Sequence, residues 1–274
     1  MSSTPPDRSN RSLAVLIDFE NLAMGFPAGQ KEAFDIDRVL DRLLEKGKVV
    51  VKVAYADWSR FRAYVNELHE AGIELIEIPK RKMTGKNSAD IRLVVDAMDL
   101  SYSKDHIDTF VIVSGDSDFS PLVGKLKENG KSVIGLGMRD STSKLLADNC
   151  DEFLYYEDLR PESKPAAGSA SRVPDDKKVA FEPLFDAIRA LQRENYDVLL
   201  ASRIKETMKR KHPAFTESAY GYRSFSELLE DAEEGGFIEL RTDERSGTYV
   251  VTQLKTGRKR SRGRGARARK PAET

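Results

Sequence analysis

Two stretches of the sequence decide the expected fold: LAVLIDFEN at residues 13–21 and VIVSGDSDF at residues 111–119. Each begins as an apolar run typical of a strand buried on both faces, and each run stops at or near an aspartate. In an open parallel α/β sheet, ligands bind outside the carboxyl ends of the strands, so Asp18, Asp116 and Asp118 are expected to converge there. Clustered carboxylates repel one another unless a cation neutralises them, and oxygen ligands favour Mg²⁺ or Mn²⁺. These stretches therefore predict a metal site.

Around these stretches, strand-like and helix-like segments alternate. Strands are expected at residues 13–18, 49–55, 73–78, 110–113, 132–136 and 153–156, with helices at 36–46, 58–71, 89–100, 119–129 and a short one ending at 148. A β-α-β-α-β order predicts a parallel sheet with right-handed crossovers. We expect an α/β domain with three layers, α/β/α.

Composition shifts divide the rest of the chain. We expect disorder at residues 1–11, the α/β domain at 12–157, a linker at 158–177, a second domain at 178–254 and a basic disordered tail at 255–274. The second domain carries three amphipathic helical patterns and then two short strands at residues 237–241 and 248–252. Three helices followed by a hairpin predict a small winged helix-turn-helix domain.

The net charge of zero hides an asymmetry. Residues 255–270 hold nine Lys and Arg and no acid, whereas residues 1–254 hold 36 Lys and Arg against 44 Asp and Glu. Such a basic block typically binds nucleic acid through counterion release. One cysteine and three scattered histidines argue against a zinc site, and the absence of a long apolar run or a signal peptide predicts a cytoplasmic protein without a membrane contact.

A fourth acid is expected beside a basic loop. Pro79 ends a predicted strand, and the following loop carries four cations, Lys80, Arg81, Lys82 and Lys86. Ser88 then suits the N-cap of a helix whose first turn contains Asp90. In that helix the apolar stripe is expected at Ile91, Val94, Val95 and Met98. Taken alone, Asp90 and the loop are better explained by an ordinary helix start and a solvated surface.

The first domain resembles the NYN domain of the PIN-like nuclease superfamily, and most closely its bacterial LabA-like members. The resemblance rests on LIDFENL at residues 16–22, KNSADIRLVVDAM at 86–98 and VSGDSDFSPLVGKLKENGKSVIGLG at 113–137. It implies a metal-dependent ribonuclease whose catalytic, metal-binding acids are Asp18, Asp90, Asp116 and Asp118. Polar positions of the same motifs, implied to support the site or to orient the substrate, are Asn21, Ser114 and Asp96. Asp96 lies about 240° around the helix from Asp90, which argues against its direct ligation of the metal.

The second domain resembles the OST-HTH/LOTUS domain, on the residues FTESAYGYRSFSELLEDAEEGGFIELRTDERSGTYVV at 215–251. That family implies binding of RNA or of a protein partner rather than chemistry. Basic residues of the second helix that suit RNA phosphates include Arg203, Lys209 and Arg210, with the four cations of the basic loop as further substrate contacts. A solvated helix face would explain any one of these cations equally well.

Three functions are consistent with these patterns. The first is a metal-dependent ribonuclease with an RNA-binding C-terminal module. The second is a regulator that binds RNA without cleaving it. The third is another metal-dependent phosphoryl hydrolase, such as a phosphatase or a Toprim-type nuclease, although Asp18-Phe19-Glu20-Asn21 departs from the D-x-D-x-T/V pattern of haloacid dehalogenase phosphatases. Related nuclease folds often dimerise, which leaves a homodimer open.

Overall fold

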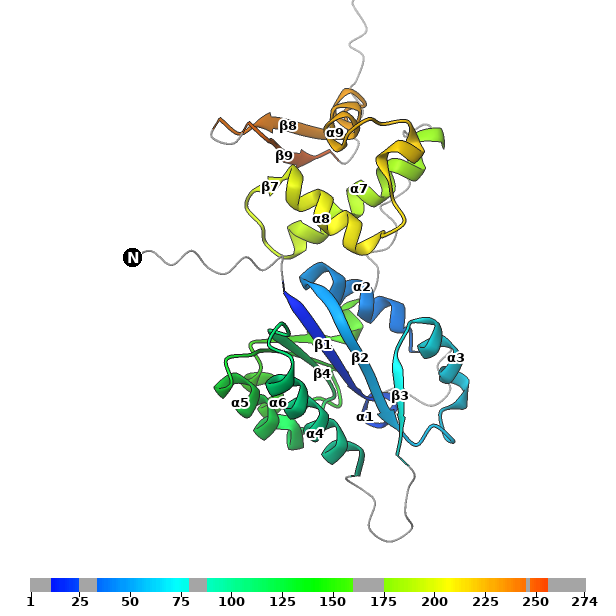
Figure 1. Ribbon diagram of the computed structural model, residues 1–274, viewed down its shortest axis with the longest axis vertical. Helices are drawn as coiled ribbons and strands as arrows, with labels where there is room; N and C mark the ends of the chain where they lie inside the picture. Colours follow the sequence, from blue (N-terminus) through cyan, green and yellow to red (C-terminus); the bar gives the residue numbers. More distant parts are fainter. Residues whose placement is uncertain (1–10, 25–33, 79–87, 160–174, 245–246, 256–274) are drawn as a thin grey trace, which may run out of the picture.

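The computed structural model describes residues 11–24, 34–78, 88–159, 175–244 and 247–255. They form a larger α/β domain and a smaller C-terminal domain, which lies beside helix α2 of the first (Figure 1). The predicted N-terminal disordered segment (except Arg11), the basic loop and the basic tail beyond Lys255 lie outside the described residues.

A six-stranded parallel sheet forms the centre of the larger domain. Its order is β3-β2-β1-β4-β5-β6, and every neighbouring pair is parallel. The strands are β1 (Ser12–Asp18), β2 (Lys48–Ala56), β3 (Glu74–Glu77), β4 (Thr109–Val113), β5 (Ser132–Gly137) and β6 (Glu152–Tyr155). The six expected strands and their parallel pairing are confirmed. The central strands β1 and β4 are the most buried, as their uninterrupted apolar runs require.

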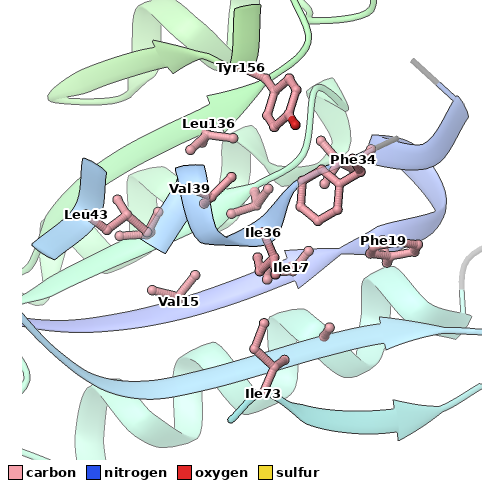
Figure 2. Close-up of a cluster of buried hydrophobic side chains, with 14 of the residues drawn as sticks. Val15, Ile17, Phe19, Phe34, Ile36, Val39, Leu43, Ile73, Leu136 and Tyr156 are labelled. Atoms are coloured by element: carbon pink, nitrogen blue, oxygen red, sulfur yellow. The ribbon is translucent and has the colours of Figure 1, made fainter. Parts of the chain in front are cut away.

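Helices cover both faces of this sheet (Figure 1). One face carries α2 (Ile36–Lys46) and α3 (Arg62–Glu70), and the other α4 (Ser88–Ser103), α5 (Ser120–Glu128) and α6 (Lys144–Asn149). Alternate residues of β1 enter two separate cores: Val15 and Ile17 pack with α2, whereas Leu16 packs with α4 and α5. Figure 2 shows the first of these cores, with Ile36 and other α2 side chains above the sheet. The expected α/β/α layering is confirmed.

The local predictions for the larger domain needed three corrections. A short helix, α1 (Phe19–Met24), follows β1 where a loop was expected, and its Asn21 N–H donates to the Asp18 carboxylate. Helix α3 begins at Arg62, four residues later than predicted. The apolar stripe predicted on α4 is wrong for Ile91 and Val95, which are 63% and 56% exposed. Val94 and Met98 do pack against the core, beside the buried residues Leu93, Ala97 and Ser101.

The C-terminal domain combines three helices with a small antiparallel sheet. Its elements are α7 (Asp175–Arg193), β7 (Leu199–Leu200), α8 (Ala201–Lys211), α9 (Phe225–Glu234), β8 (Ile238–Thr242) and β9 (Tyr249–Leu254), with strand order β7-β9-β8. Strand β7 was not predicted. Helix α7 starts inside the range expected to be a linker, and Lys177 in its first turn is ion-paired with Asp231 of α9 at 2.6 Å. None of the helices in the described part of the chain has both the length and the apolar composition that crossing a membrane requires.

Buried charges join the two domains. The carboxylate of Glu45, at the end of α2, contacts Arg193 of α7 and Lys211 of α8, and the side chains of Glu45 and Lys211 are each only 1% exposed. Burial opposes the charge on Glu45 most strongly, yet the cations Arg193, Lys211 and Arg42 hold its pKa below the ordinary value. Because a buried charge needs its partners, these contacts fix how α2 meets the C-terminal domain.

Replacing Glu45 with Gln should lower the free energy of unfolding by roughly 3 kcal/mol, because three cations lose a buried counter-charge. Urea unfolding at pH 7 measures the change. Glu128→Gln is the matched control: it breaks an ion pair with Lys125 whose side chains are 66% and 56% exposed, and it should change stability by less than about 0.5 kcal/mol. Equal effects of the two substitutions would contradict the buried network.

Candidate functional site

The carboxyl ends of β1 and β4 bring two distant stretches of the chain together. The strands are neighbours, with Ile17 paired to Val113, so the residues that follow them emerge side by side. The Ser114 hydroxyl donates to one carboxylate oxygen of Asp18 at 3.1 Å, although 96 positions separate them. Asp18 and Ser114 are 4% and 0% exposed. The edge of the sheet therefore holds a buried carboxylate with a fixed orientation.

Asn21 ties the turn after β1 to the turn after β4. Its backbone N–H donates to Asp18 Oδ1 at 3.2 Å, and its side-chain Oδ1 accepts the N–H of Gly115 at 2.8 Å. Gly115 has no space for a side chain, because a Cβ there would lie 2.7 Å from the Ser141 carbonyl oxygen. This glycine lets the chain pass close to both Asn21 and the loop after β5.

The turn after Gly115 carries two further acids, Asp116 and Asp118. The N–H of Asp116 donates to the Ser114 hydroxyl at 3.2 Å. Asp116 then caps the 3-10 turn Ser117–Phe119 by accepting the N–H of Asp118 at 3.0 Å. The capping hydrogen bond restrains the Asp116 side chain. Asp118 is exposed. One hydrogen-bonded chain thus runs from Asp18 through Ser114 to both acids.

The acids at this edge affect one another's ionisation. Burial raises the pKa of Asp18 to about 7, against the opposing hydrogen bond from the Asn21 N–H, and the charges of Asp90 and Glu20 raise it further. Burial also raises the pKa of Asp90, with further contributions from Asp116 and Asp118. The charges of Asp116 and Asp118 thus act on Asp90, which in turn acts on Asp18, so ionisation of Asp18 and Asp90 is disfavoured.

A geometrically complete metal site is not present in the described part of the chain, where no three His, Cys, Asp or Glu side chains form a group that could hold a metal ion. The chemistry of the donors nevertheless suits a divalent cation, because all four are carboxylates. Burial and neighbouring acids raise the pKa of two of them, Asp18 and Asp90. A bound cation would relieve both effects.

Glu20 is a residue of this edge that the sequence analysis missed. One of its carboxylate oxygens accepts the N–H of Asp57 at 3.2 Å, and the other contacts Arg60 Nη1 at 3.2 Å. Its charge acts on both Asp18 and Asp90. Its place between Asp18 and Asn21 in the LIDFEN motif could have indicated that Glu20 belongs to the site. Its partners, however, come from the loop after β2 and carry no motif.

Asp96 supports the site from a distance. Its carboxylate accepts the hydroxyl of the fully buried Tyr55 at 2.9 Å and pairs with Arg92 at 2.9 Å. Tyr55 lies next to Asp18 in the register of β1 and β2. The Tyr55–Asp96 hydrogen bond therefore holds α4, and with it Asp90, against the sheet. This position agrees with the expectation that Asp96 does not share the face of Asp90.

The basic residues predicted to contact RNA have different surroundings. Lys80, Arg81, Lys82 and Lys86 lie outside the described residues. On α8, Lys209 is exposed and Arg203 stacks over the Tyr196 ring at 4.4 Å. Arg210 donates to the carbonyl oxygens of Leu44 and Glu45, so its guanidinium is engaged in the contact between the domains. The three α8 residues therefore do not form one exposed phosphate-facing row.

The first domain matches a known protein family. The NYN domain family matches residues 12–157, which is more than half of the chain and covers the whole six-stranded sheet. The chain belongs to the NYN domain family. NYN domains have the fold of PIN-like nucleases, which act on nucleic acids and generally use divalent metals.

Two individual proteins are similar to the NYN domain of this chain. An uncharacterized protein from Methanocaldococcus jannaschii is 29% identical over 145 residues, which are 53% of this chain and 55% of that protein. The chain thus matches about half the length of this relative. A crystal structure of a protein of unknown function from Vibrio parahaemolyticus has 25% sequence identity and a TM-score of 0.49, covering 57% of this chain and 98% of the other.

Replacing Asp18 with Asn should raise the free energy of unfolding of the metal-free protein at pH 8 by roughly 3 kcal/mol. The raised pKa means that wild-type stability falls as the pH rises from about 4 to about 7, because the carboxylate must then ionise while buried. The Asn variant lacks this contribution. Urea unfolding in EDTA from about pH 4 to about pH 8 measures the difference.

If the difference in the free energy of unfolding between Asp18→Asn and wild type does not grow with pH, the raised pKa of Asp18 is contradicted. Asp99→Asn changes an exposed aspartate on α4, and as the control it should alter the free energy of unfolding by less than about 0.5 kcal/mol.

Proposed function

We propose that the chain is a metal-dependent ribonuclease whose NYN domain hydrolyses RNA phosphodiester bonds. The observation that carries this proposal is the buried Asp18 carboxylate, which is oriented by Ser114 and Asn21 and surrounded by the charges of further acids at the carboxyl edge of the sheet. A structural acid would not need such an environment, since strand ends and helix caps are ordinarily exposed or neutralised.

Asp18, Asp90, Asp116 and Asp118 would hold Mg²⁺ or Mn²⁺. The bound cation would supply positive charge that activates water and stabilises the phosphorane-like transition state. The protein's own contribution is orientation: Ser114 donates to Asp18, and Asp116 is fixed by capping the 3-10 turn. Asn21 keeps the β1 and β4 turns in register through Gly115. Asp96 keeps α4 in place through Tyr55.

The C-terminal domain would add affinity for RNA. Its three helices followed by the β8–β9 hairpin support a winged-helix, LOTUS-like interpretation, in which exposed Lys209 is the best placed of the α8 cations. The basic loop at residues 80–86 and the tail would contribute further phosphate contacts through their charge. Binding of a protein partner through this domain is a separate proposal. A homodimer is another, and it is based on the resemblance to related nuclease folds.

A second candidate is an RNA-binding regulator that uses both domains without cleavage. The observation that favours it is the lack, among described residues, of three acidic, histidine or cysteine side chains grouped to hold a metal. Only turnover distinguishes it from the nuclease.

Asp116→Asn should reduce RNA cleavage at least about a hundredfold, because it removes an acid that would hold the cation and restrain the turn. Single-stranded and structured RNA are incubated with Mn²⁺ or Mg²⁺, and products are resolved on denaturing gels. EDTA should abolish cleavage by the wild type. Asp99→Asn is the matched control on α4 and should retain activity.

Equal RNA breakdown by wild type and Asp116→Asn would identify a contaminating nuclease and remove support for the enzyme. RNA binding without any metal-dependent breakdown would favour the regulator.

A further inference from the structure

The loop after β2 reaches the same edge as the acids. Tyr55 of β2 pairs with Asp18 of β1, so residues 57–61, which follow β2, lie next to the turn that carries Glu20. The hydrogen bond from Asp57 N–H to Glu20 at 3.2 Å joins this loop to the first turn of α1. Two neighbouring strand ends are thereby connected through one carboxylate.

The loop after β2 also places a cation, Arg60, beside Glu20. Its Nη1 contacts Glu20 at 3.2 Å, while half of its side chain is exposed and its guanidinium lies over the Phe61 ring at 5.4 Å. Phe61 in turn packs against the buried Phe19, so the ring that the Arg60 guanidinium contacts is itself held by the core. A guanidinium carries five N–H donors, and one contact to Glu20 leaves further donors for an anion.

An acidic edge needs such a cation if it is to accept a polyanion. The charges of Asp18, Asp90 and Glu20 repel phosphate, and each phosphate of RNA brings another negative charge. Arginine suits this position because its planar fork can bind phosphate while it stays charged.

We propose that Arg60 binds a backbone phosphate of the RNA at the acidic edge, and that Glu20 positions its guanidinium for this contact. The proposal rests on the proposed function, because it takes RNA to be the substrate of this edge. It assigns the β2 side of the site to the RNA backbone.

The test measures binding without cleavage. Every protein is the full chain carrying Asp116→Asn, and fluorescence anisotropy follows a fluorescein-labelled single-stranded oligouridine over a range of KCl concentrations. Arg60→Ala should weaken binding several-fold at low salt and reduce the magnitude of the slope of log K against log [KCl] by about 0.7, the contribution of one phosphate contact to a single strand. Arg60→Lys keeps the charge and should retain the slope.

Lys125→Ala is the control. Lys125 is a half-exposed cation near the end of α5, ion-paired with Glu128, and its loss should leave the slope unchanged. Matching circular dichroism spectra establish that the variants fold.

An unchanged slope in Arg60→Ala, an equal change in Lys125→Ala, or an absence of oligouridine binding by the parent protein would each overturn the proposal. Failure of the nuclease proposal is distinguishable, since it appears as lack of metal-dependent cleavage by wild type while Arg60-dependent binding persists.

Discussion

Negative charge held at the carboxyl edge of the sheet is the constraint on which the functional account depends. The pairing of β1 with β4 leaves Asp18 beside Ser114, and the hydrogen bonds of Asn21 keep the two turns together. Burial and neighbouring acids disfavour ionisation of Asp18 and Asp90. A fold that gathers acids in this way gains by binding a cation, whereas an isolated helix cap would not.

Sequence patterns predicted the sheet well because each strand of the α/β domain is marked by an apolar run of its own. Apolar runs between turn residues located the six strands, and their alternation with helices gave the parallel pairing. The face of α4 could not be chosen in this way, because Ile91 and Val95 have the same helical spacing as Leu93 and Ala97. Close packing on the sheet decided it, and the small side chains of Ala97 and Ser101 became the buried ones.

The candidate site was predictable where its residues belong to strand ends. Asp18 is the last residue of β1, and Ser114 and Asp116 follow β4, so their approach could be expected from topology alone. Glu20 was missed because its partners, Asp57 and Arg60, come from a loop with no recognisable motif. Arg210 was predicted to face phosphate because the sequence pattern of a helix does not show what packs against it. In the structure, Arg210 donates to carbonyl oxygens of α2, in the other domain.

The most direct test of the account is a crystal structure of the full chain soaked in Mn²⁺, with diffraction data collected at a wavelength where manganese scatters anomalously. The account predicts an anomalous peak bound by carboxylate oxygens of Asp18, Asp116 and at least one of Asp90 and Asp118. Fully soaked crystals with no peak at this edge, or with these side chains directed away from one another around water, would contradict it.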